Sequence, residues 1–114
     1  MLLALSTALE QNDPARFLAQ FDPEHCRDYP ALQDNVVALL AQYEVASSVA
    51  LLAETRDGDG YDLKLDWLLH LRPAAGGPAS QRRRALRCRI HRRGRHWKVT
   101  ALEPASFFAA VEPK

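Results

Sequence analysis

The sequence is poor in cysteine. Only Cys26 and Cys88 occur in 114 residues, and their separation fits neither a zinc-ligand spacing nor the dense pattern of a disulfide-stabilised domain. We therefore expect both thiols to be reduced and buried. A glycine-rich phosphate loop is also lacking: the motif DGDG at 57–60 joins two strands and carries negative charge that disfavours phosphate. No cofactor is expected.

Long apolar runs are missing as well. None approaches the roughly 18 to 20 residues that a membrane-spanning helix needs. The opening MLLALSTALEQND contains an apolar stretch, but it lacks a basic region before that stretch and a clear small-residue cleavage site. We expect this segment to be a helix of the domain, with no membrane partner and a cytoplasmic location.

What is present is the composition of one soluble globular domain spanning residues 1–114, with 47% hydrophobic and 25% charged residues. The net charge of +1 conceals an asymmetry: residues 1–81 carry a net −7 and residues 82–114 a net +8. Blocks of opposite charge in one domain are expected to face each other in part. That arrangement disfavours a strong external field of either sign.

The first 42 residues have helical patterning. A leucine stripe predicts a first helix that runs toward Asn12, and Asp13 followed by Pro14 predicts the start of a second. The Asp22-Pro23 step is expected to end that second helix. Pro30 opens a third, whose apolar residues recur at helical spacing: Leu32, Val36, Leu39, Leu40 and Tyr43.

From residue 44 the apolar period changes to two, which is typical of strands. We predict strands over 44–56, 61–72, 82–93 and 96–103, with DGDG as a hairpin turn between the first two. The fold class is therefore α+β: N-terminal helices packed on one face of a curved four-stranded antiparallel sheet.

Two segments of the sequence resemble those of a known family. LSTALEQNDPARFLAQFDP and RRGRHWKVTALEPASFF, together with the order of elements, resemble the nuclear transport factor 2-like superfamily, which includes SnoaL-like proteins and has a cone-shaped, cystatin-like α+β fold. One departure is that segment 22–30 is too short for an extra strand pair at the mouth of the cone. The superfamily includes enzymes, adaptors and small dimers without known activity, so the resemblance alone does not indicate a function.

The alternation predicts the concave face of the sheet. Neither a carboxylate nor a histidine falls among these positions, which are Val45, Ser47, Val49, Leu51, Tyr61, Leu63, Leu65, Trp67, Leu69, Leu71, Leu86, Cys88, Ile90, Trp97, Val99 and Ala101. We expect any ligand pocket to be lined by Tyr29, Tyr61, Leu65, Trp67, Cys88 and Trp97.

The polar run His25–Tyr29 offers the only dense cluster near the mouth of the cone. In an enzyme, His25 or Asp28 would act as general base and Tyr29 as oxyanion donor, and a Cys26/His25 nucleophilic pair is conceivable. The interpretation we prefer is a polar loop that Tyr29 anchors to the core. No metal site is expected, because the spacing of His70, His91 and His96 matches no known ligand motif.

The stretch RRRALRCRIHRRGRHWK at 82–98 holds nine of the fifteen Lys and Arg residues. Alternation places most of its arginines on the outer face, so we expect Asp66 to pair with Arg87 or Arg89 across the strands, and Asp62 with His91 or Arg93. A nucleic-acid surface would need aromatic residues on that same face. Since Trp97 belongs to the buried row, nucleic acid is not an expected partner.

The outer face also carries small and aliphatic residues, and homodimers through this face are usual in the superfamily that the chain resembles. We expect a dimer face containing Leu52, Leu68, His70, Arg87, Arg89, Thr100 and Leu102. The predicted function is a homodimeric, non-catalytic binding or structural module that holds a small apolar ligand in the cone. Two alternatives stay open: an isomerase or dehydratase on an apolar ring or acyl substrate, and a protein- or RNA-contacting module built on the arginine-rich strand.

Overall fold

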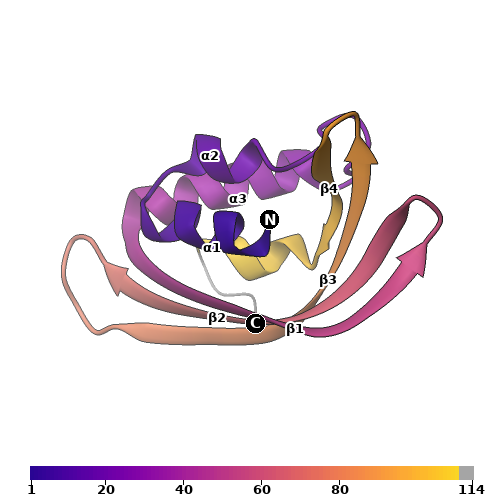
Figure 1. The fold of residues 1–114 in the computed structure, drawn as a ribbon. Coiled ribbons are helices and arrows are strands. Elements are labelled where there is room, and N and C mark those ends of the chain that lie inside the picture. Colours follow the sequence, from indigo (N-terminus) through magenta and orange to yellow (C-terminus); the bar gives the residue numbers. More distant parts are fainter. Residues whose placement is uncertain (111–114) are drawn as a thin grey trace.

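The computed structural model describes residues 1–110. Helices α1 (Leu2–Glu10), α2 (Pro14–Leu18) and α3 (Tyr29–Gln42) precede strands β1 (Tyr43–Asp57), β2 (Gly60–Pro73), β3 (Ser80–Arg93) and β4 (His96–Glu103), and a short 3-10 helix, η1 (Ala105–Phe108), follows. The strands form one antiparallel sheet in the order β1-β2-β3-β4. The sheet curves around the helices, which pack on its concave side (Figure 1). The α+β fold class predicted from the sequence is confirmed.

The second helix begins as predicted and ends earlier. The Asp13 side chain accepts a hydrogen bond from the Arg16 backbone N–H at 3.0 Å, which is the capping geometry expected before a proline. The helix stops at Leu18 because the next residues pair with the free edge of β4. There Asp22 N–H donates to the Val99 carbonyl at 2.9 Å, and Val99 N–H donates to that of Gln20 at 2.8 Å.

This pairing is an isolated parallel bridge between Phe21 and Val99. The bridge residue, Phe21, comes just before segment 22–30, and that segment itself contains no strand, in keeping with the departure noted in the sequence.

Two irregularities change which face some residues occupy. In β1 the register passes from Leu51↔Leu65 to Ala53↔Lys64, so Leu52 is a bulge residue. In β4 the register passes from Ile90↔Val99 to Arg89↔Ala101, which makes Thr100 the extra residue. An extra residue inverts the inward–outward alternation beyond it.

The bulge in β4 overturns two expectations. Leu102, expected on the outer face, faces Cys88 and is wholly buried in the core, and Ala101, expected on the concave row, lies opposite the outward-facing Arg89. Leu51, expected on the concave row, lies opposite Leu65, yet its side chain is 49% exposed.

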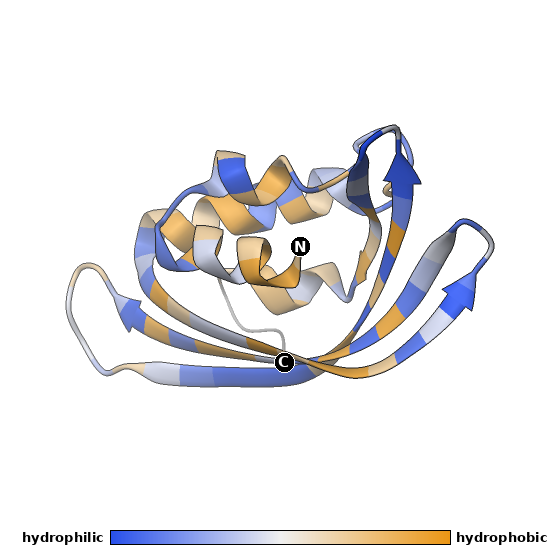
Figure 2. Ribbon diagram, in the orientation of Figure 1, coloured by the Kyte–Doolittle hydropathy of each residue, from blue (hydrophilic) through white to orange (hydrophobic). Residues whose placement is uncertain are grey.

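The concave side is filled by side chains. The helices contain many apolar residues (Figure 2), of which Leu5, Phe17 and Leu39 are completely buried. The short helix η1 lies between α3 and the strands (Figure 1). Phe108 packs edge-on against Trp67 with ring centroids 5.2 Å apart, and its ring lies 5.6 Å from that of Phe17. All three side chains are completely buried. The closing hydrophobic stretch of the sequence is therefore a central part of the core.

Candidate functional site

A short polar chain crosses the interior between α1 and the sheet. The Trp67 indole N–H and the Ser6 hydroxyl both donate to Ser47 Oγ at 2.8 Å. The alternation of β1 turns Ser47 inward, and α1 brings Ser6 to it. Because buried polar groups are costly when they lack partners, this chain satisfies the indole within the core, where it has a structural role.

The six predicted pocket residues separate into three places. Leu65, Trp67 and Cys88 lie wholly inside the core. Tyr29 is half-buried at the start of α3 and packs edge-on against Phe21, with centroids 6.3 Å apart. Tyr61 and Trp97 meet at the far end of the sheet, with centroids 5.7 Å apart. The structure therefore does not gather the six side chains around one cavity.

An ionic cluster occupies the rim near the third helix. Asp22 Oδ2 lies 2.8 Å from both His25 Nδ1 and Arg93 Nε. Burial raises the pKa of Asp22, but the hydrogen bonds from Arg93 and His25 outweigh burial and hold the pKa below its usual value. Arg93 was expected to pair with Asp62. Asp22 was not predicted as a partner, because its place before Pro23 indicated only the end of a helix.

The predicted catalytic candidates do not converge. His25 is exposed and bound to Asp22, whereas Asp28 and Tyr29 form the start of α3, where the Asp28 side chain makes no capping hydrogen bond. Burial raises the pKa of Cys26, which is 4% exposed, so this thiol is held in its neutral form. That protonation state is wrong for the nucleophile of a Cys26/His25 pair.

The thiols are buried as expected. Cys88 is completely buried, and desolvation raises its pKa to about 12. Both cysteines are free thiols.

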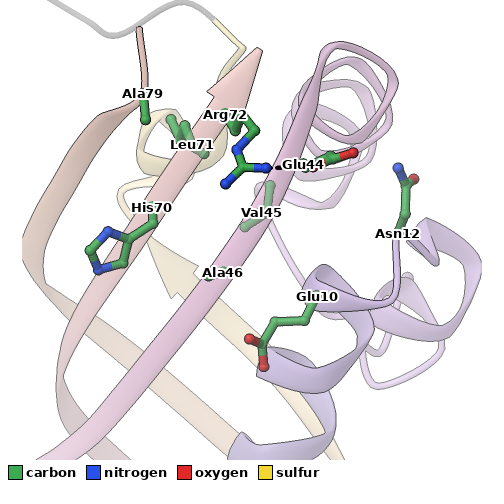
Figure 3. A pocket seen from close by; sticks show the side chains of 9 residues that line it. All are labelled: Glu10, Asn12, Glu44, Val45, Ala46, His70, Leu71, Arg72 and Ala79. Atoms are coloured by element: carbon green, nitrogen blue, oxygen red, sulfur yellow. Dashed lines mark ion pairs between the residues drawn. The ribbon is translucent and has the colours of Figure 1, made fainter. Parts of the chain in front are cut away.

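A groove of about 660 Å³ lies beside β1, at the end of the sheet near α1 (Figure 3). Arg72 reaches toward Glu44, with 3.8 Å between Nη1 and Oε2, while His70 and Glu10 extend from separate elements without meeting. Both partners of the ion pair are more than two-thirds exposed, and exposed pairs contribute little. Four ionisable groups therefore line this groove without forming a coupled acid–base pair.

The outer face carries an ordered set of ion pairs between β2 and β3. Arg83 binds Asp66 through Nε and Nη2 at 3.0 and 2.6 Å, and Arg87 binds Asp62 through the same atoms at 3.1 and 2.5 Å. Arg89 Nε lies 3.6 Å from Asp62. Pairing with arginine lowers the pKa of both carboxyls, chiefly through the Arg87 hydrogen bonds at Asp62 and the Arg83 hydrogen bonds at Asp66.

Ion pairs between aspartates of β2 and basic residues of β3 were therefore predicted correctly, but each aspartate pairs with a different residue from the ones expected. The loop at 74–79 sets β3 opposite β2 in a register that places Leu68 beside Arg83 and Lys64 beside Arg87. Asp66 and Asp62 therefore reach these arginines diagonally.

Of the predicted dimer-face residues, six lie on the outer side of the sheet and Leu102 does not. Thr100 is almost buried and its hydroxyl lies 2.7 Å from His91 Nδ1, whereas Leu52 is 55% exposed. Between Glu44 and Glu54, β1 carries no charged residue. A strip of exposed small and aliphatic side chains thus borders the arginine–aspartate pairs: Ala46, Ser48, Ala50, Leu52 and Ala53.

Within residues 1–110, no three His, Cys, Asp or Glu side chains are grouped closely enough to hold a metal ion. None of the helices in that part of the chain combines the length and the apolar character needed to cross a bilayer.

No protein-family model and no curated protein sequence matches this chain. Several solved structures, however, match its fold. A nuclear transport factor 2-like superfamily protein from Salmonella enterica serovar Typhimurium aligns with a TM-score of 0.69, covering 89% of this chain and 82% of its own length at 12% identity. This chain has the nuclear transport factor 2-like fold. The fold implied by the resemblance is thereby confirmed.

Other proteins with the nuclear transport factor 2-like fold differ in activity. A hexachlorocyclohexane dehydrochlorinase aligns with a TM-score of 0.66 at 15% identity, over 89% of this chain and 79% of that one. A protein of unknown function from Mycobacterium tuberculosis aligns with a TM-score of 0.72 at 16% identity over 89% of this chain, which spans only 64% of that protein's length. Enzymes and proteins without known activity share this fold, so the site must decide the function.

Proposed function

We propose that this protein is a non-catalytic module that forms a homodimer through the outer face of its sheet. The observation that carries the proposal is the exposed, uncharged strip of β1 beside arginine–aspartate pairs that neutralise one another. Exposed apolar patches with polar rims are typical of protein interfaces. Here Leu52 lies in the strip, and the ion pairs of Asp62 and Asp66 form its border.

A second copy of the chain is the occupant that best suits this face. The arginines Arg83 and Arg87 already hold carboxylates of the same chain, so the face offers little net charge to a strongly acidic or basic partner. A two-fold axis brings identical patches together, and small side chains such as Ala46 and Ala50 allow two sheets to approach closely.

The interior supports a role without catalysis. Trp67, Phe17 and Phe108 fill the space on the concave side, and a small apolar ligand in the cone would have to displace part of this core. The isomerase or dehydratase alternative would need His25, Asp28 or Tyr29 to face a cavity, yet His25 is exposed and bound to Asp22.

Sedimentation velocity at micromolar concentration tests the dimer. We expect a species with the mass of two 12.8 kDa chains, and we expect Leu52→Glu to convert it to a monomer, because a carboxylate would be buried at the interface without a partner. Leu3→Glu is the matched control: Leu3 is 77% exposed on α1, away from the sheet's outer face, so this variant should remain dimeric. A monomeric wild-type protein would rule out the proposal.

A further inference from the structure

A second cleft lies at the opposite end of the sheet from the groove in Figure 3. It has a volume of about 470 Å³, and its lining comes from the turns and adjoining strand ends of the β1–β2 and β3–β4 hairpins: Arg56, Asp59, Gly60, Tyr61, Arg92, Gly94 and Trp97. We call it the distal cleft. Its lining residues come from all four strands or their turns and from none of the helices.

Two aromatic rings stand in the distal cleft. Tyr61 lies opposite Ile90, and Trp97 lies opposite Arg92, so both rings project from the concave face. Their centroids are 5.7 Å apart with planes inclined by 46°, and both side chains are half-buried. A pair of partly open ring faces is a stacking surface, since aromatic rings and nucleobases stack without regard to the identity of the base.

Arginines alternate with these rings across the sheet. Arg56 in β1 lies opposite Tyr61 in β2, and Arg92 in β3 lies opposite Trp97 in β4. From the edge strand β1 to the edge strand β4, these side chains therefore follow one another across the sheet in the order arginine, tyrosine, arginine, tryptophan.

Both arginines are held in place by their own turns. Arg56 Nε donates to the Gly58 carbonyl at 3.3 Å, and Arg92 Nε donates to that of Gly94 at 3.1 Å. Within residues 1–110 neither guanidinium has a carboxylate within 4.0 Å, whereas Arg83, Arg87, Arg89 and Arg93 are all ion-paired. The guanidinium groups of Arg56 and Arg92 are thus available to bind an external anion.

Glycine shapes the cleft at one position. A Cβ atom at Gly60 would lie 2.2 Å from the Ile90 carbonyl oxygen, so only glycine lets β2 and β3 approach this closely at the residue before Tyr61. A larger residue there would separate the strands that carry Tyr61 and Arg92.

We propose that the distal cleft binds a nucleoside phosphate. The base stacks on Tyr61 and Trp97, and the terminal guanidinium nitrogens of Arg56 and Arg92 bind the phosphate oxygens, because the guanidinium fork matches phosphate geometry. The Asp59 carboxylate at the rim accepts hydrogen bonds from ribose hydroxyls or base amino groups. A free nucleotide and one unit of a single strand present the same chemistry.

This site differs from the basic surface considered in the sequence. The outer arginines Arg83, Arg87 and Arg89 are ion-paired, whereas the distal cleft combines two aromatic rings with arginines that have no carboxylate partner within residues 1–110. It is also independent of the proposed dimer, which uses the opposite face of the sheet.

Two probes test the proposal on the full-length chain. Adenosine 5′-monophosphate should quench the tryptophan fluorescence saturably, since Trp97 is accessible while Trp67 is buried, and a short labelled single-stranded RNA should show raised anisotropy if the ligand is a strand. Binding of the nucleotide alone assigns a free ligand. Binding of the RNA alone, weakened by salt, assigns a unit of a strand.

Matched variants identify the site. The double variant Arg56→Gln/Arg92→Gln should weaken binding of whichever probe binds by about tenfold or more, as expected for loss of charge-assisted contacts to phosphate. Arg83→Gln, on the outer face, should change it by less than about twofold because that arginine is already paired. The proposal is wrong if neither probe binds, if inorganic phosphate binds as well as the nucleotide, or if Arg83→Gln weakens binding as much as the double variant.

Discussion

At the scale of single residues, one hydroxyl group joins three elements. Ser47 Oγ accepts hydrogen bonds from α1 through Ser6 and from β2 through Trp67, each at 2.8 Å. The indole is completely buried, and in an apolar interior a donor without a partner retains the full cost of its lost hydration. Ser47 thereby fixes both the ring of Trp67 and the distance of α1 from the sheet.

Replacing this hydroxyl should be costly. Ser47→Ala leaves the Trp67 indole N–H and the Ser6 hydroxyl without their acceptor, and we expect the free energy of unfolding to fall by about 1–3 kcal/mol. Urea denaturation measures the change. Ser48→Ala, at the next residue on the exposed outer face, should stay within about 0.5 kcal/mol of wild type. Equal effects of the two substitutions would contradict this role.

Some residue assignments followed from the alternation and others could not. The pattern of β2 correctly predicts its buried row, because every second residue from Leu63 to Leu71 is apolar and buried. The alternation of β3 gives no reason to expect a buried arginine, yet Arg82 is only 7% exposed. Arg82 Nη1 donates to the carbonyls of Phe107 and Ala109 at 2.7 Å. Its burial depends on a segment 25 residues away, which no local period can show.

At the scale of elements, η1 is the piece that completes the core. Asn35 Nδ2 of α3 donates to the Ala105 carbonyl at 3.0 Å, and Arg82 of β3 holds the other end. Between these anchors Phe107 and Phe108 pack edge-on with centroids 5.1 Å apart. Four residues of 3-10 helix thus connect the helical layer to the sheet.

Removing one of these rings should show how far the stability of the fold depends on η1. Phe108→Ala removes a completely buried ring that contacts Trp67, Phe17 and Phe107, and we expect it to cost about 3–5 kcal/mol of unfolding free energy. Thermal unfolding followed by circular dichroism measures the loss. Leu3→Ala, on the exposed side of α1, is the control and should change the midpoint little. A well-folded Phe108→Ala protein with wild-type stability would contradict a core role for η1.

The strands were predicted to within two residues at each end, because their alternation is uninterrupted near the turns. The bulges were not predicted, since an inserted residue changes the face of its successors without changing composition. Leu102 illustrates the point: its sequence position indicates the outer face, and the extra residue Thr100 turns it into the core. The short helix η1 has no period at all, and only its hydrophobic character was visible.

At the scale of the whole molecule, the two charge blocks of the chain meet as expected. The acidic first 81 residues contribute Asp22, Asp62 and Asp66, and the basic remainder contributes their arginine partners. Each of these carboxyls has a lowered pKa in the folded chain. Their ionised forms therefore stabilise the fold above the pKa of the unfolded chain, about 3.9 for Asp, and this stabilisation is lost as the pH falls through the lowered values.

A triple variant tests this linkage. Asp22→Asn/Asp62→Asn/Asp66→Asn should be less stable than wild type at pH 7, and its unfolding midpoint in urea should fall less steeply between about pH 5 and pH 2. The control changes three other exposed acidic residues, Glu24→Gln/Asp34→Asn/Glu54→Gln, and should keep the wild-type pH dependence. If the unfolding midpoint of the Asp22/Asp62/Asp66 variant falls with pH as steeply as that of wild type, the arginine–aspartate pairs do not determine the loss of stability at acidic pH.

The position of Phe107 and Phe108 has a consequence for how the protein is made. A ribosome releases α1, α2 and α3 before any of the sheet, and the rings that fill the space between them are synthesised only after β4. Until residue 108 has emerged, the apolar sides of the helices have no complete surface to cover them, and such exposed surfaces attract chaperones or neighbouring chains. The nascent chain must therefore keep its helices soluble while about two-thirds of the domain is still being translated.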